Sequence, residues 1–229
     1  APPGPWRLGP AKLHLHEASL PPFEEATAFI AAAHEQSRAV AIHCVSEVEL
    51  VYALATLEAA GASSGDRIEH ASVASDELIG RIAALKLHVC VQPHFVAERG
   101  DRYLADVETR HHGELYRLRA FAEAGVTMAG GSDAPFASPD PWAAMAAAVS
   151  RRTVSGAVIG AGEALMPEEA LALHLADPAA LSRQRRVAVG EPADLCLLDR
   201  PWAQARSRLT SADIRATFIA GDCVYQAPA

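Results

Sequence analysis

The sequence predicts an α/β protein in which the strands of a parallel sheet alternate with helices, followed by a smaller β-rich segment. Short, turn-bounded apolar runs such as residues 39–43 are typical of strands covered on both faces. Between these runs, apolar residues recur every three or four positions in alanine-rich stretches, which is the period of a helix. Beyond residue 186 the pattern changes to short β-like runs. We therefore predict an α/β portion at residues 1–186 and a β portion at residues 187–229.

The α/β portion is predicted to consist of repeated βα units. Strands are expected at 11–15, 39–43, 67–70, 88–91 and 126–129. Helices are expected at 23–36, 47–60, 76–85 and 114–124, with two more beginning at Pro141 and Pro167. A long loop is expected at 92–113, and loops of that length in a compact domain are often functional. In the β portion, strands are expected at 193–198, 216–219 and 223–225, with a hairpin turn at 220–222.

The amino-acid composition and charge narrow the classes of molecule that the protein is expected to bind. The chain has 229 residues, is 50% hydrophobic and carries a formal net charge of −8. An acidic chain gives no reason to expect nucleic acid or an anionic membrane as partner, so small molecules are the expected ligands. Four cysteines without a CxxC spacing indicate neither a disulfide framework nor a zinc knuckle, and we expect a reducing, cytoplasmic location. No apolar run reaches the roughly 18 residues of a membrane span.

Three polar side chains follow predicted strands directly. His43 and His70 end their strands, and Asp133 lies in the Gly-Gly-Ser-Asp-Ala-Pro-Phe segment after another. Barrels of alternating strands and helices keep their active sites at this carboxyl edge of the sheet. Imidazole and carboxylate ligands suit a zinc-like ion, which lowers the pKa of a bound water toward neutrality. A lone histidine at a strand end is more often structural, but three such residues at consistent positions favour a metal site.

Longer motifs extend this pattern along the chain. They are Ala-Ile-His at 41–43, Arg-Ile-Glu-His-Ala at 67–71, Val-Gln-Pro-His-Phe at 91–95, Gly-Gly-Ser-Asp-Ala-Pro at 130–135 and Gly-Glu-Pro-Ala-Asp-Leu at 190–195. Together they resemble the amidohydrolase superfamily, and within it the amidohydrolase-3 branch of YtcJ-like metal-dependent hydrolases. The resemblance implies the C-terminal part of a (β/α)8 barrel, about strands four to eight, followed by a segment of a small β-sandwich. It also implies hydrolysis of an amide-type carbon–nitrogen bond other than a peptide bond, with one or two divalent ions, expected to be Zn²⁺.

The resemblance also assigns roles to residues of this chain. It implies that His43, His70 and Asp133 bind metal and that Asp133 shuttles the proton. Lys12 resembles a lysine on the fourth barrel strand that is carboxylated in many family members, where it bridges two metals. A binuclear site is therefore expected only if Lys12 is carboxylated.

Three further residues are candidates for substrate binding. Gln92 and His94 follow the strand that would be the seventh of the barrel, where loops carry function. For His94, a structural turn built around Pro93 has equal weight. The segment with Arg117 and Arg119 resembles an arginine-containing segment that precedes the last barrel helix in the family. The expected substrate is a small molecule with an amide-type bond.

The chain departs from the family at its start. The family's His-x-His pair on the first barrel strand has its expected place upstream of residue 1, and the opening at residues 1–5 is proline-rich and lacks Met. We therefore expect the downstream part of a longer reading frame, whose partner is the missing N-terminal half of the barrel or a second copy of the chain. The local pair His14 and His16 directly follows Lys12, and too few βα units come after it to complete eight. For this pair we favour a surface or substrate-side role, so that truncation to Ala leaves metal binding intact.

Simpler interpretations are preferred for several other polar residues. His111 and His112 are expected on a solvated surface. Glu69 is expected on the opposite face of its strand from His70, paired with Arg67 or with a helix cation.

Two alternative functions stay open. A deaminase of the same superfamily would use similar ligands on a ring amidine and would release ammonia. A non-catalytic fragment or binding module would use the histidines and Asp133 only to hold loops in place. Such a protein would have no hydrolytic activity for the substitution Asp133→Asn to remove.

Overall fold

Five parallel strands form the central sheet of the computed structural model, which describes residues 8–228. They are hydrogen-bonded in the order β1-β2-β3-β4-β5, and each pair is parallel. The strands are β1 (Ala11–His14), β2 (Val40–Cys44), β3 (Arg67–His70), β4 (His88–Val91) and β5 (Thr127–Gly130). All five match the predicted strands to within one residue at each end. The proline-rich opening at residues 1–5 lies outside the described residues.

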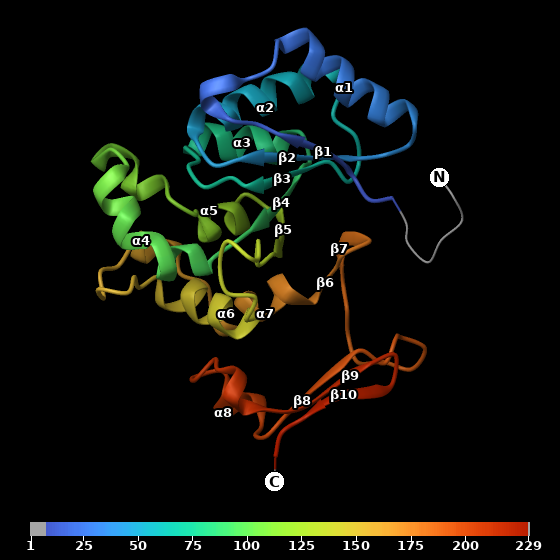
Figure 1. The fold of residues 1–229 in the computed structure, drawn as a ribbon, viewed down its shortest axis with the longest axis vertical. Coiled ribbons are helices and arrows are strands. Elements are labelled where there is room, and N and C mark those ends of the chain that lie inside the picture. The colour runs from blue at the N-terminus through green and yellow to red at the C-terminus, as the bar shows by residue number, and fades with distance from the viewer. Residues whose placement is uncertain (1–7, 229) are drawn as a thin grey trace.

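Helices connect these strands and follow the last of them. They are α1 (Phe23–Glu35), α2 (Glu47–Ala60), α3 (Asp76–Ala84), α5 (Leu118–Glu123), α6 (Pro141–Ser150) and α7 (Pro167–Leu175), with the short turns η1 (Glu17–Ser19) and η3 (Ala161–Glu163). Figure 1 shows α1, α2 and α3 together on one side of β1–β3. The start of α2 is fixed by a capping box between Ser46 and Glu49, which satisfies backbone donors at the helix start.

A further helix, α4 (His94–Asp106), occupies most of the segment 92–113, so the prediction of a long loop is wrong. Gly100 and the charged residues around it weakened the helical pattern in the sequence. In the structure Gly100 permits a close approach, because a Cβ there would lie 2.5 Å from Thr153 Cγ2 and 2.9 Å from Ile159 Cδ1. Packing therefore outweighs the ~1 kcal/mol that a glycine costs within a helix.

The helix predicted at 114–124 is shorter than expected. The 3-10 turn η2 (Thr109–Glu114) comes first, and Tyr116 then adopts a left-handed conformation with a φ of 51°. Because this conformation interrupts an α-helix, α5 begins only at Leu118.

The main hydrophobic core lies between the sheet and its helices. Alternate residues of the strands, among them Ile42, Ile68 and Val89, are fully buried there. The helices contribute Ile30, Leu54 and Ile82, which are also fully buried. The strand residues between them, such as Lys12 and Glu69, face a cavity on the opposite side of the sheet.

The C-terminal region forms two antiparallel sheets. A pair that the sequence did not predict, β6 (Ala176–Asp177) and β7 (Ala180–Gln184), precedes a three-stranded sheet of order β10-β9-β8. The strands of the latter are β8 (Leu195–Leu198), β9 (Ile214–Ile219) and β10 (Asp222–Gln226), as predicted, with α8 (Trp202–Ala205) and η4 (Ser211–Asp213) between them. Figure 1 shows this sheet apart from β1–β5. The domain boundary at residue 186 stays a prediction.

The C-terminal sheet is connected to the α/β portion through α8. Trp202 Nε1 donates to Glu168 Oε1 of α7 at 3.0 Å, and Arg206 forms a bidentate ion pair with the same carboxylate. In the described part of the chain, the helices are all too short or too polar to cross a membrane.

Candidate active site and metal centre

A cavity of about 910 Å³ opens at the carboxyl end of the parallel strands. Its polar wall comes from strands β1–β4 and from the segments that directly follow β2–β5. Of the residues predicted to form the site, the structure brings five to this wall: Lys12, His43, His70, Gln92 and Asp133. Their roles stay predictions, but their shared location is the one expected of barrel active sites.

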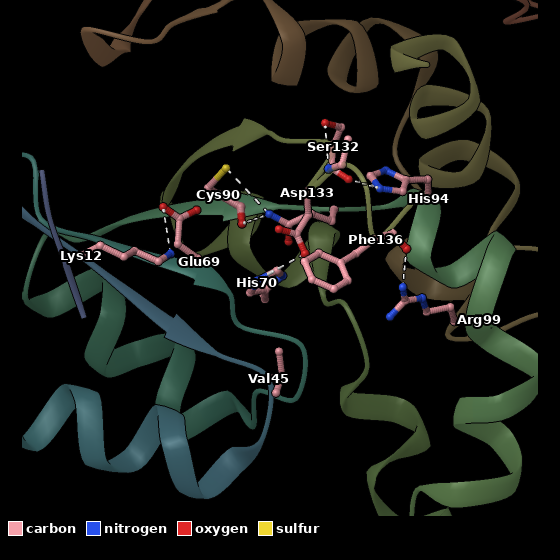
Figure 2. Close-up of polar contacts among 12 residues, drawn as sticks. Lys12, Val45, Glu69, His70, Cys90, His94, Arg99, Ser132, Asp133 and Phe136 are labelled. Atoms are coloured by element: carbon pink, nitrogen blue, oxygen red, sulfur yellow. Dashed lines mark hydrogen bonds and ion pairs between the residues drawn. The ribbon is translucent and has the colours of Figure 1, made fainter. Parts of the chain in front are cut away.

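Three imidazoles form a row along this wall. The ring centroids of His14 and His43 are 4.2 Å apart, and those of His43 and His70 are 4.6 Å apart. At the end of the row, His70 Nε2 lies 4.0 Å from Asp133 Oδ2 (Figure 2). The row thus presents ligand-type side chains from β1, β2, β3 and the segment after β5.

Backbone conformation explains why His70 and Asp133 reach the cavity. Both residues are left-handed, with φ values of 72° and 50°, which is uncommon for residues other than glycine and concentrates at functional sites. At His70 this turn breaks the alternation of β3. Glu69 therefore lines the cavity as well, and the prediction that it points away from His70 is wrong.

Glu69 has the partner that the sequence predicted. Arg67 Nε donates to its Oε1 at 2.8 Å, and Lys12 Nζ lies 3.8 Å from the same oxygen. Burial raises the pKa of the Glu69 carboxyl, but the charge and hydrogen bond of Arg67 outweigh it, so that the net pKa is lowered. Glu69 is therefore ionised, and its negative charge balances its neighbours Arg67 and Lys12.

Two imidazoles of the row, those of His43 and His70, have lowered pKa values and are held neutral. Burial, together with the neighbouring His70 and His14, lowers the pKa of His43 to about 4. Burial also lowers the pKa of His70, although the Asp133 charge opposes the shift. A neutral imidazole has a free lone pair, which is the form that binds metal.

His94 lies beside the Asp133 segment and not on the cavity wall. It is 1% exposed, and its Nε2 donates to the Ser132 carbonyl at 2.8 Å, as Figure 2 shows. This hydrogen bond holds the segment that carries Asp133, which agrees with a structural role for His94 and not with a contact to substrate. Behind it, burial lowers the pKa of His174 to about 4.

The two other substrate-binding candidates are placed differently. Gln92 lines the cavity, its Nε2 donates to the Cys90 carbonyl at 3.0 Å, and its buried Oε1 has no partner among the described residues. Arg119 does not line the cavity and instead forms a bidentate ion pair with Glu169 at 2.8 and 2.6 Å. Gln92 is therefore placed to contact a substrate in the cavity, whereas Arg119 is held away from it.

The opposite wall of the cavity is apolar and comes mainly from α4 and the segment before α5. It includes Phe95, Tyr103, Val107, Leu115 and Tyr116. The two tyrosines are stacked with centroids 5.7 Å apart, and their hydroxyl oxygens lie 3.0 Å apart. We call these five residues the apolar wall. The sequence pattern did not predict this wall, because it did not predict α4.

A separate cluster lies near the end of η2. His111 Nδ1 is 2.5 Å from Glu114 Oε2, and its Nε2 is 3.9 Å from Glu47 Oε2. His112 Nε2 donates to the Val107 carbonyl at 2.8 Å. Both histidines are half-buried, so the prediction of a solvated surface is wrong. Among the described residues, Glu47, His111 and Glu114 are the group whose ligand atoms all lie close enough together to hold an ion as they stand.

Comparison with known proteins identifies the class of protein that this fold and site define. A model of the amidohydrolase family matches residues 7–225, so the chain belongs to that family. The YtcJ protein of Bacillus subtilis (strain 168), which is named as an amidohydrolase, is 28% identical over 85% of this chain and 39% of its own length. An N-substituted formamide deformylase of Arthrobacter pascens is 29% identical over 70% of this chain and 31% of its own length. The chain thus spans less than two fifths of either relative.

Solved structures support the same fold. An uncharacterized metal-dependent hydrolase from Pyrococcus furiosus aligns with a TM-score of 0.60 and 30% identity, over 68% of this chain and 32% of that one. The described chain is therefore part of a (β/α)8 barrel followed by a small β segment, as the sequence predicted.

Proposed function

We propose that this chain carries the metal-binding part of an active site that hydrolyses an amide-type carbon–nitrogen bond other than a peptide bond. The observation that supports this proposal most directly is the meeting of His43, His70 and Asp133 on one cavity wall at the carboxyl end of the sheet. Each residue comes from a different βα unit, and barrel enzymes assemble their catalytic groups in this way.

The residues present fit a divalent ion, for which we propose Zn²⁺. The donor set combines neutral imidazoles with one carboxylate, which suits zinc. The Nδ1 atom of His70 is buried and has no hydrogen-bond partner within the described residues, although most buried polar atoms have one. An ion bound here supplies a water whose pKa is lowered toward neutrality and polarises the substrate carbonyl.

Asp133 is the group that we propose to move the proton. Its side chain is 37% exposed, so it can reach both solvent and substrate, and it lies beside the ligand His70. A carboxylate at this position can accept a proton from the attacking water and return it to the leaving nitrogen. The hydrogen bond from His94 to the Ser132 carbonyl keeps this segment in place while Asp133 acts.

The apolar wall supports a substrate with a large apolar group next to its amide. A ring placed among Tyr103, Tyr116 and Phe95 would bury its surface without unpaired polar atoms, while the amide faces the imidazole row. The similarity to a relative named as an N-substituted formamide deformylase supports N-substituted formamides as the first compounds to test. We also propose a cytoplasmic location, which the four free cysteines among the described residues support.

Substrate preference tests this proposal in the whole protein encoded by the reading frame that contains this chain. We expect N-(2-phenylethyl)formamide to be hydrolysed with a kcat/KM at least about tenfold above that of N-ethylformamide, because burying a phenyl ring contributes about 1.5–3 kcal/mol. Tyr103→Ala should reduce that ratio several-fold, since Tyr103 lines the apolar wall. Formate release measures the reaction.

The matched control is Tyr225→Ala, because Tyr225 is exposed on β10 and does not line the cavity. Equal rates for the two formamides would contradict the role of the apolar wall. Ammonia release from ring amidines, with no formamide hydrolysed, would instead favour the deaminase alternative.

A further inference from the structure

One cation interrupts the apolar face that α4 turns toward the cavity. Phe95, Arg99 and Tyr103 recur every four residues on this helix, so they share one face, and all three line the cavity. The guanidinium carbon of Arg99 lies 4.7 Å from the centroid of the Phe95 ring. Arg99 is half-buried, and a charge in such surroundings is costly unless a group of opposite sign compensates it. This face of α4 therefore suits an anionic partner.

The described residues supply no carboxylate to Arg99. Most arginines of residues 8–228 pair with an Asp or a Glu, but Arg99 is not among them. Its Nη2 donates to the carbonyl of Phe136, which is a neutral acceptor. Figure 2 shows the side chain reaching from α4 toward the segment that carries Asp133 and Phe136. The other N–H groups of the planar guanidinium are available to bind a carboxylate.

Arg99 is separated from the proposed metal site by one aromatic ring. The ring of Phe95, which contacts the guanidinium, is stacked with that of His70 at a centroid distance of 6.2 Å. A substrate whose amide faces the imidazole row can therefore extend along Phe95 and reach Arg99 with a group attached near its nitrogen. The carboxylates of the cavity, Glu69 and Asp133, belong to the polar wall, whereas Arg99 belongs to the wall opposite.

We propose that Arg99 binds a carboxylate of the substrate, so that the preferred substrates are amides whose nitrogen substituent carries both an aromatic ring and a carboxylate. This inference rests on the proposed function and names its substrate class more closely. The ring packs on the apolar wall, and the carboxylate pairs with the guanidinium. N-formylphenylalanine is the simplest test compound, because it is N-(2-phenylethyl)formamide with one carboxylate added.

These two formamides measure the effect of the carboxylate in the whole protein. We expect kcat/KM for one enantiomer of N-formylphenylalanine to exceed that for N-(2-phenylethyl)formamide by at least about tenfold, because hydrogen bonds between charged groups are the strong ones. Arg99→Met should lower the ratio of the two values by at least about tenfold, mainly through a higher KM for the acid. Losing the contact with Phe136 affects both substrates and cancels in the ratio. Arg99→Lys, which keeps the charge but not the planar fork, should recover part of the ratio.

Arg102→Met is the matched control. Arg102 lies on the same helix, is exposed, pairs with Asp106 and does not line the cavity. Its ratio should equal that of the native protein. An unchanged ratio in Arg99→Met would overturn the inference, as would a native protein that hydrolyses the neutral formamide faster than either enantiomer of the acid.

Direct binding separates this inference from the proposed reaction. If neither formamide is hydrolysed, the proposed function fails, and calorimetry with N-acetylphenylalanine then decides the role of Arg99. We expect Arg99→Met to weaken this binding by at least about tenfold and Arg102→Met to leave it unchanged. Equal affinity in Arg99→Met and the native protein, or no binding to the native protein, would overturn the assignment.

Discussion

Replacing Asp133 with Asn is expected to lower kcat/KM by at least about 10³-fold, because general acid–base catalysis by one side chain contributes roughly 10²- to 10⁴-fold and a ligand charge is lost as well. Asn keeps the size and shape of the side chain but cannot accept a proton. The left-handed backbone at this position tolerates Asn well, so the fold should be unaffected.

The measurement is steady-state hydrolysis of an N-substituted formamide by the whole protein. Asp106→Asn is the matched control, since Asp106 is exposed at the end of α4 and pairs with Arg102 at the surface. Full activity in this control, with activity lost in Asp133→Asn, is the expected pair of results. An Asp133→Asn enzyme that retained near-native kcat/KM would rule out Asp133 as the proton shuttle.

Replacing Arg151 with Met is expected to reduce the free energy of unfolding by about 3 kcal/mol or more, because each buried acceptor left unpaired costs about 1–3 kcal/mol. Arg151 is completely buried. Its guanidinium donates to the carbonyls of Ile159, Tyr116 and Leu115, each at 2.9 Å. Burial lowers its pKa to about 10, so it stays charged at neutral pH.

Urea unfolding of the whole protein would measure this loss as a shift of the transition midpoint. Its neighbour provides the control: Arg152 is exposed and donates to the Gly156 carbonyl at the surface, so Arg152→Met should change stability by less than about 0.5 kcal/mol. Similar shifts in the two variants would show that Arg151 does not hold these segments together. Because Tyr116 and Leu115 belong to the apolar wall, substrate preference should weaken in parallel.

The strands could be predicted because their signal is local. The strands β2, β4 and β5 are short, mainly apolar runs, whereas apolar and polar residues alternate in β1 and β3. Both patterns are local signals of a strand, whatever its neighbours in the sheet are. The positions of His43, His70 and Asp133 followed from the same rule, since parallel strands end at one edge of the sheet. The sequence alone therefore predicted that these three residues lie close together, and all three line one cavity.

The features that were missed depend on distant contacts. Helix α4 contains Gly100, whose benefit is visible only where Thr153 packs against it. Glu69 joins His70 on the cavity wall because His70 is left-handed, and alternation along a strand cannot indicate that turn. The position of His14 in the chain did not indicate a place beside the expected metal ligands. Its ring contacts His43 because of the register between β1 and β2.

The metal content of the whole protein, purified without chelators, tests the central claim most directly. We predict roughly one divalent ion or more for each chain, as expected of a catalytic zinc site, and loss of that ion in His70→Ala. His88→Ala is the matched control, because His88 lies at the start of β4, away from the cavity at the carboxyl end. Native metal content in His88→Ala together with its loss in His70→Ala would support the site. Equal metal content in His70→Ala and the native protein would contradict it.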